Sequence, residues 1–243
     1  EQIQAILQAA RENNSPVIIQ ASRVALKYTN MVYIKYLVQA AVEENPDLPV
    51  ALHLDHGTVE AAQIAISLGF TSVMIDGSHY PFEENVRLTR QVVDMAHAHG
   101  VTVEAELGTL GGIEEDVKGE VQLTDPDQAE EFVKRTGCDA LAVAIGTSHG
   151  AYKFQSEPKL ALDLVSEISK RVRIPLVMHG SSSVPQDLVK SINRHGGRLE
   201  NTFGVPVEAI QAAIQRGVCK VNVDTDLRLA ATAAVRRVLA EEP

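Results

Sequence analysis

Short apolar runs recur along the chain, separated by stretches in which apolar residues have helical spacing. The runs are rich in Val, Ile, Leu or Ala, as expected of parallel strands that are covered on both faces. Seven such runs predict strands, at residues 16–20, 49–54, 71–75, 101–107, 140–145, 174–179 and 219–223. The alternation of strand and helix patterns predicts an α/β fold with a parallel sheet.

Helices are predicted between these strands at residues 1–10, 60–68, 82–99 and 128–135. The last of these has a clear start, because Asp125 can cap it and Pro126 suits its first turn. Strand and helix patterns continue to the end of the chain without a linker or a change in composition. We therefore expect residues 1–243 to form a single domain.

Polar residues follow nearly every predicted strand. This distribution distinguishes between the two folds that seven parallel strands allow. An open doubly wound sheet needs ligands only from the strands that flank its switch point. In a closed (β/α)₈ barrel, by contrast, the ends of all strands surround one site. The polar residues at the strand ends are Ser22, Asp55, His56, Asp76, Glu106, His149, His179, Asn222 and Asp224. They favour a (β/α)₈ TIM barrel, whose first strand we expect to precede Glu1.

The composition limits the classes of partner and the cellular compartment that we expect for this chain. Lys and Arg total 22 against 32 Asp and Glu, a net charge of −10, which argues against nucleic acid as the main partner. Neither a run of 18 apolar residues nor a secretory signal is visible, so no membrane role is expected. Two cysteines, Cys138 and Cys219, cannot form a disulfide framework, and we expect a reducing, cytoplasmic location.

Three histidines that follow different strands form the first candidate site. His56 belongs to the segment His53-Leu54-Asp55-His56-Gly57, which taken alone could be an ordinary hydrogen-bonded cluster. Together with His149 and His179, it offers three imidazoles around an open position, the ligand set of a catalytic zinc ion. The remaining histidines, His79, His97, His99 and His195, are expected to be solvated.

Carboxylates form the second group of candidates. Glu104 and Glu106 share one face of a predicted strand, because side chains alternate along a strand. Their spacing fits either a salt-bridged interior or a second cation site that includes Asp76. Glu114 follows two glycines, so it belongs either to a solvated charge run or to a loop that brings a base to the substrate.

Small polar residues at 179–183 and 222–226 follow the last two predicted strands. The corresponding loops of barrel enzymes commonly bind phosphate, although turn chemistry alone would also select such residues. Position in the barrel favours a phosphate site.

Six motifs together resemble the class II, metal-dependent fructose-bisphosphate aldolases. They are HLDHG at 53–57, FTSVMIDGSH at 70–79, VEAELGTLGGIEED at 103–116, LAVAIGTSHGAYK at 141–153, VMHGSSSVP at 177–185 and KVNVDTDLRLA at 220–230. The resemblance covers essentially the whole chain in order. It implies reversible aldol cleavage of fructose 1,6-bisphosphate to dihydroxyacetone phosphate and glyceraldehyde 3-phosphate through a zinc-stabilised enediolate. The reaction would serve glycolysis, gluconeogenesis or the Calvin cycle.

The resemblance also implies a role for each site residue. His56, His149 and His179 would bind zinc, and Asp76 and Glu106 would support it or hold a second cation. Asp55 would be the acid/base at the C4 hydroxyl, and Glu114 would handle the C3 proton. The substrate would contact Ser22, Gly150, Gly180, Ser181, Ser182, Asn222, Val223, Asp224 and Thr225. A homodimer or homotetramer is expected from the same resemblance.

Several alternatives remain open at this stage. Tagatose-bisphosphate aldolases are related, but they usually have glycines where this chain has Ser181 and Ser183, and they lack the long connection at 191–217. A Schiff-base aldolase would need a lysine at a strand end, and neither Lys153 nor Lys220 is well placed. A metal-dependent hydrolase would typically show two histidines as HxH on its first strand. A binding protein without turnover is the remaining possibility.

The chain also departs from the family pattern. The family has a strand before residue 1 and an arginine-bearing segment after residue 243, and it has a longer stretch after Glu115. Segments missing from the given sequence would explain all three differences, and a truncated, impaired barrel is the alternative.

Overall fold

The structure is a computed structural model that describes residues 1–114, 117–118, 122–149 and 158–241, with side chains described outside 111–121 and 149–157. The chain divides into two compact units. The first comprises residues 1–106 and 132–140, and the second comprises residues 107–131 and 141–243. Each unit is described separately below.

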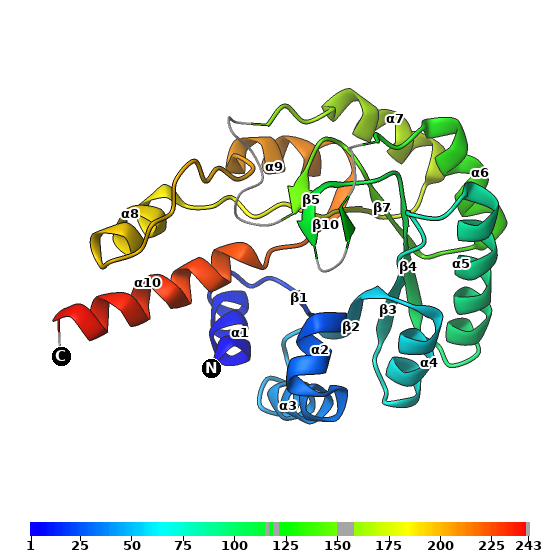
Figure 1. Cartoon of the computed structure of the whole chain (residues 1–243). Helices are drawn as coiled ribbons and strands as arrows, with labels where there is room; N and C mark the ends of the chain where they lie inside the picture. The colour runs from blue at the N-terminus through cyan, green and yellow to red at the C-terminus, as the bar shows by residue number, and fades with distance from the viewer. Residues whose placement is uncertain (115–116, 119–121, 150–157, 242–243) are drawn as a thin grey trace. The chain divides into compact units, whose positions relative to one another are not determined.

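The first unit contains four parallel strands that pair in chain order (Figure 1). They are β1 (Val17–Ser22), β2 (Val50–Gly57), β3 (Ser72–Ile75) and β4 (Thr102–Leu107). The register of β1 and β2 places Ser22 opposite Asp55. Because parallel strands end on the same side of a sheet, the polar residues that terminate β1 to β4 gather along one edge.

Five helices belong to this unit: α1 (Gln2–Glu12), α2 (Arg23–Thr29), α3 (Met31–Glu43), α4 (Val59–Ser67) and α5 (Phe82–His97). α4 packs against β2, β3 and α5. Its start is fixed by Thr58, whose hydroxyl accepts a hydrogen bond of 3.2 Å from the backbone N–H of Ala61. The buried side of β2 and β3 is apolar where it meets the helices, and Leu54 and Val73 are fully buried.

The second unit contains three parallel strands in the order β7 (Ala140–Val143), β9 (Leu176–Met178) and β10 (Val218–Val221). A small second sheet has the order β6 (Val117–Lys118), β5 (Gly111–Glu114) and β8 (Ser148–His149). In this sheet β5 pairs antiparallel with β6 and parallel with β8. The sheet pairs β5, which ends at Glu114, with β8, which ends at His149.

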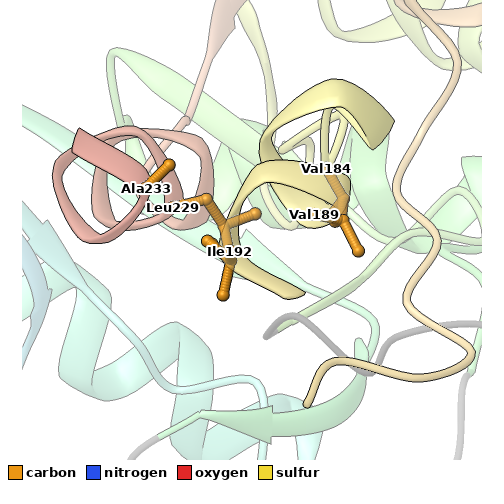
Figure 2. Close-up of a cluster of buried hydrophobic side chains, with 5 residues drawn as sticks. All are labelled: Val184, Val189, Ile192, Leu229 and Ala233. Atoms are coloured by element: carbon orange, nitrogen blue, oxygen red, sulfur yellow. The ribbon is translucent and has the colours of Figure 1, made fainter. Parts of the chain in front are cut away.

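Helices α7 (Leu162–Val172), α8 (Gln186–Arg194), α9 (Val207–Ile214) and α10 (Thr225–Glu241) complete this unit, and α6 (Pro126–Thr136) begins in it. α8 packs against α10 through an apolar cluster that Figure 2 shows. The buried members of this cluster are Val184, Val189, Ile192, Leu229 and Ala233. The contact brings the first turn of α10 to the segment that precedes α8.

All seven predicted parallel strands are confirmed, and so are the four predicted helices. The cap predicted for α6 is present, because Asp125 Oδ1 accepts a hydrogen bond of 2.9 Å from the backbone N–H of Gln128. The helices α2, α3 and α7 to α10 lie outside the four ranges that the sequence pattern predicted. Among the described residues, no helix combines the length and the apolar content needed to cross a membrane.

One of the four histidines predicted to be solvated is partly buried. His79, His97 and His99 are exposed as expected. In His195, however, Nδ1 lies 2.8 Å from the carbonyl oxygen of Ser191, and Nε2 lies 3.6 Å from a carboxylate oxygen of Glu241. The prediction of a solvated side chain was wrong for His195, because α10 covers the end of α8 where this residue lies. A contact between two helices that are distant in the sequence leaves no local pattern.

The two cysteines should differ sharply in reactivity. Cys138 is buried, and this burial raises the pKa of its thiol to about 11, whereas Cys219 is exposed. Because the thiolate is the reactive form, titration with Ellman's reagent at about pH 8 should modify one thiol rapidly and the second only after denaturation. Cys219→Ser should remove the rapid phase. Two rapid thiols in the native protein would contradict this prediction.

Candidate active site and metal centre

A bulge at the end of β2 brings two consecutive polar side chains to one place. The pairing of β2 with β3 shifts between Leu54 and Gly57, and His56 adopts a left-handed conformation with φ of 46°. Regular alternation would send Asp55 and His56 to opposite faces of the sheet. A bulge re-aims a side chain, and here the polar atoms of both residues lie within 4.8 Å of one another.

His56 is held from the neighbouring strands by two carboxylates. Its Nδ1 lies 2.9 Å from Oδ2 of Asp76, at the end of β3, and 3.8 Å from Oε2 of Glu106, in β4. Asp76 is in turn fixed by Ser78, whose backbone N–H and hydroxyl donate to Oδ1 over 3.1 and 2.7 Å. Three consecutive strands therefore position one imidazole.

The carboxyl group of Asp76 remains ionised in this setting. Burial alone would raise its pKa, but the hydrogen bond and charge of His56, together with the two hydrogen bonds from Ser78, outweigh that effect. The pKa of Asp76 is consequently well below its ordinary value. An ionised partner on Nδ1 makes Nε2 the nitrogen that His56 would present to a metal ion.

Asp55 lies buried beside this group with part of its carboxylate unsatisfied. Oδ2 accepts a hydrogen bond of 3.4 Å from the side-chain amide of Gln20, on β1. Oδ1 is buried and has no hydrogen-bond partner among the described residues. Since a buried carboxylate oxygen without a partner is costly, this atom is available to a bound ion or to a ligand that donates a hydrogen bond.

Glu104 and Glu106 have different surroundings although they share one face of β4. Glu104 Oε2 lies 3.6 Å from Nε2 of the fully buried His53, whose Nδ1 lies 2.8 Å from the hydroxyl of Ser72. Glu104 thus fits the salt-bridged interior that its spacing allowed. Glu106 fits the other alternative, because its carboxylate joins His56 and Asp76 in a group whose ligand atoms all lie within 4.8 Å.

In the second unit, His179 follows β9 and meets Asn222, which follows β10. The side-chain nitrogen of Asn222 lies 3.2 Å from Nε2 of the His179 ring. The side-chain oxygen of Asn222 is buried and has no partner in the described part of the chain. Like Oδ1 of Asp55, this atom can accept a hydrogen bond from a ligand.

Gly180 brings the end of β9 close to β8. It has φ of 61°, and a Cβ atom at this position would lie 2.6 Å from the backbone oxygen of Ser148. Only glycine allows both the conformation and the approach. Consequently the backbones of His149 and His179, each one residue from this contact, are near one another within this unit.

The loop after His179 uses its hydroxyls in several ways. Ser181 is buried and donates to the carbonyl oxygens of Met178 and His179, so its hydroxyl closes the turn. The hydroxyl of Ser182 accepts from the backbone N–H of Asp224 over 3.3 Å, which joins the two predicted phosphate segments.

The structure shows the local contacts and the exposure of the other residues that were predicted to contact the substrate. The hydroxyl of Ser22 caps α2 by accepting a hydrogen bond of 3.4 Å from Ala25. Asp224 accepts a hydrogen bond from Arg228, and Val223 is 42 % exposed. Thr225 begins α10.

Three predicted sites lie wholly or partly outside the described residues. They are Gly150 and the side chains of His149 and Glu114. Their predicted roles remain predictions, as do the roles of all other site residues.

The group formed by His56, Asp76 and Glu106 fits a divalent metal ion. It combines one imidazole with two carboxylates, donors that zinc and harder divalent cations both accept. A carboxylate that orients a metal-binding histidine is also a common feature of such centres.

The family model described as fructose-bisphosphate aldolase class-II matches residues 1–243. The chain belongs to this family. The curated fructose-bisphosphate aldolase of Giardia intestinalis is 61 % identical over 246 residues, which cover 100 % of this chain and 76 % of that protein. A fructose-bisphosphate aldolase of Nostoc sp. is 52 % identical over 269 residues, covering 100 % of this chain and 75 % of that protein.

A solved structure, that of the YdjI aldolase from Escherichia coli K12, is 36 % identical to the chain with a TM-score of 0.79. The match covers 100 % of this chain and 78 % of that one. Together with the seven parallel strands, these likenesses confirm the α/β, (β/α)₈-type fold with one strand fewer than eight. They also confirm a metal-dependent aldolase that cleaves fructose bisphosphate reversibly.

The Asp76 carboxylate should control metal affinity through His56. Asp76→Asn keeps the shape of the side chain but removes the charge that orients the imidazole. Replacing such a partner typically costs 10–100-fold in metal affinity, so competition with a fluorescent zinc chelator should show a loss of about that size. Asp94→Asn, which changes an exposed aspartate on α5, is the control and should leave affinity unchanged. Equal affinities in the two variants would exclude this role for Asp76.

Proposed function

We propose that this chain cleaves fructose 1,6-bisphosphate between C3 and C4 with Asp55 as the proton acceptor at the C4 hydroxyl. The observation that carries this proposal is the buried Oδ1 of Asp55, which lacks a hydrogen-bond partner among the described residues and adjoins His56. The position supplies an acceptor in a place from which water is largely excluded. The reaction yields dihydroxyacetone phosphate and glyceraldehyde 3-phosphate.

In this proposal His56, His149 and His179 are the ligands of a zinc ion. The histidine motifs and the orientation of His56 by Asp76 support this ligand set. Asp76 and Glu106 either orient His56 or hold a second divalent or monovalent cation. When bound, the metal supplies Lewis-acid stabilisation of negative charge on the substrate oxygens.

Each of the two proton transfers in the reaction is assigned to a different carboxylate. Asp55 takes the proton of the C4 hydroxyl as the C3–C4 bond breaks, and Gln20 holds its other oxygen in place. Glu114 returns a proton to C3 after the aldehyde has left. Because the acceptor and the donor lie on different segments, the two steps can be tested separately.

Binding of the phosphates fixes the reacting carbons. We assign the phosphate of the ketone half to Gly150, to Gly180–Ser182 and to the segment 222–225, where backbone N–H groups and hydroxyls are available. We assign Ser22 to the aldehyde half, and its register opposite Asp55, the proposed proton acceptor, supports this assignment. The unpartnered oxygen of Asn222 would accept a hydrogen bond from the substrate.

The same proposal extends to the choice of substrate, the domain organisation, the oligomeric state and the location of the protein. We infer fructose rather than tagatose bisphosphate as the substrate, because serines occupy positions 181 and 183 and the connection at 191–217 is long. We also propose a single catalytic domain, a homodimer or homotetramer, and a cytoplasmic role in glycolysis. Comparing cleavage of fructose and tagatose bisphosphates under the same conditions tests the choice of substrate.

Removal of the metal should abolish catalysis. Incubation with a chelator followed by desalting should reduce cleavage in a coupled assay to background, since charge stabilisation on the substrate oxygens is lost. Adding zinc should restore the activity, while a mock-treated sample serves as the control. Full activity of the metal-free protein would exclude the mechanism, and trapping of substrate by borohydride would indicate a Schiff base instead.

Replacement of Asp55 should separate catalysis from metal binding. Asp55→Ala should lower kcat by about 10²–10⁴-fold, the usual contribution of a general base, with zinc content unchanged. His149→Ala should lose both activity and metal, which makes it the matched comparison. Metal analysis and steady-state kinetics measure the two effects. Near-normal turnover in Asp55→Ala would refute the assignment.

A further inference from the structure

We propose that Asp226 is a positioning residue that holds Val184 in a left-handed backbone conformation and thereby fixes the loop Gly180–Ser183 for phosphate. This inference rests on the proposed function, in which that loop binds the phosphate of the ketone half. Asp226 itself need not contact the substrate. Its action is on the backbone of the loop.

Val184 adopts a conformation that its side chain disfavours. Its φ is 51°, in the left-handed region, which is a genuine outlier for a β-branched residue. The side chain is only 1 % exposed and belongs to the apolar cluster between α8 and α10 (Figure 2). A strained residue of this kind persists only where its surroundings impose the conformation, and such residues concentrate at functional sites.

Asp226, in the first turn of α10, supplies the restraint. Oδ2 accepts from the backbone N–H of Ser183 over 2.7 Å and from its hydroxyl over 3.0 Å. Oδ1 accepts from the backbone N–H of Val184 over 2.8 Å. Three hydrogen bonds to one ionised group are strong enough to hold the strained turn.

The opposite side of the loop is held independently. Gln186 donates from its side-chain amide to the carbonyl oxygens of Val184 and Thr202, over 3.0 and 2.9 Å. The backbone N–H of Val205 donates to the carbonyl oxygen of Ser182 over 3.1 Å. Gly204 lies so close to this backbone that a Cβ atom there would collide with the Ser182–Ser183 peptide.

The negative charge of Asp226 allows a positioning role to be distinguished from a purely electrostatic one. A carboxylate near an anion site would weaken phosphate binding if it acted only through charge. Here the carboxylate accepts hydrogen bonds from the loop itself, so its main effect is to fix the directions of the loop's N–H groups. Neutralising Asp226 should therefore weaken phosphate binding, whereas a purely electrostatic role predicts tighter binding.

Asp226→Asn is the first test, because it preserves the shape but cannot accept the same three hydrogen bonds. In the zinc-loaded protein, KM for fructose 1,6-bisphosphate and the inhibition constant of inorganic phosphate should both rise about tenfold, the loss expected for hydrogen bonds to a charged group. Zinc content and the pH profile should not change. Asp187→Asn, in the exposed first turn of α8, should leave all of these values unchanged.

Val184→Gly provides the second test, because glycine adopts a φ of 51° without strain. If Asp226 acts through Val184, Asp226→Asn should raise the phosphate inhibition constant less than about threefold in the Val184→Gly background, a departure from additivity that a double-mutant cycle measures. Thermal unfolding verifies that each variant folds. Asp226→Ser replaces Asp226→Asn if the latter does not melt cooperatively.

Two results would overturn the inference: unchanged or tighter phosphate binding in Asp226→Asn, or equal effects of that substitution in both backgrounds. Either would leave the proposed function standing as long as the unsubstituted protein cleaves fructose 1,6-bisphosphate. Failure of that cleavage with zinc present would instead refute the proposed function.

Discussion

The hydrogen bond between Nδ1 of His56 and Oδ2 of Asp76 is the interaction on which the polar group at the ends of β2, β3 and β4 depends. It joins the ends of β2 and β3, and it keeps in place a side chain that a bulge has turned out of the regular strand pattern. An ionised partner on Nδ1 sets the tautomer and the orientation of the buried ring. The buried carboxylates of β4 are acceptable for a related reason, because each faces an imidazole that offsets its desolvation.

Much of this fold could be predicted from the sequence, because buried parallel strands require short runs of β-branched and apolar residues. The helices α2 and α3 could not, since Val24, Tyr28, Tyr33 and Tyr36 are exposed and blur the contrast between their two faces. The site residues could be selected by their position after strands. Their geometry could not be predicted, because a left-handed turn at His56 and a contact between residues 43 positions apart, Ser183 and Asp226, leave no local sequence pattern.

The acidic composition is compatible with a substrate that carries two phosphates because several carboxylates have imidazole or N–H partners close by. Glu104 faces His53, Asp76 faces His56, and Asp226 accepts three hydrogen bonds from the loop that follows β9. Anion binding can then depend on the orientation of N–H groups rather than on a basic surface. Net charge in such a protein says more about its solubility than about the ligand of its site.

The close approach of Gly180 to Ser148 makes two segments of the chain depend on the absence of one side chain. A methyl group there would separate the segment that carries His149 from the one that carries His179, and it would also distort the serine-containing turn that follows. Gly180 is therefore a position at which even the smallest side chain would disturb the ends of two strands at once. Alanine there would combine a steric collision with a disfavoured backbone conformation.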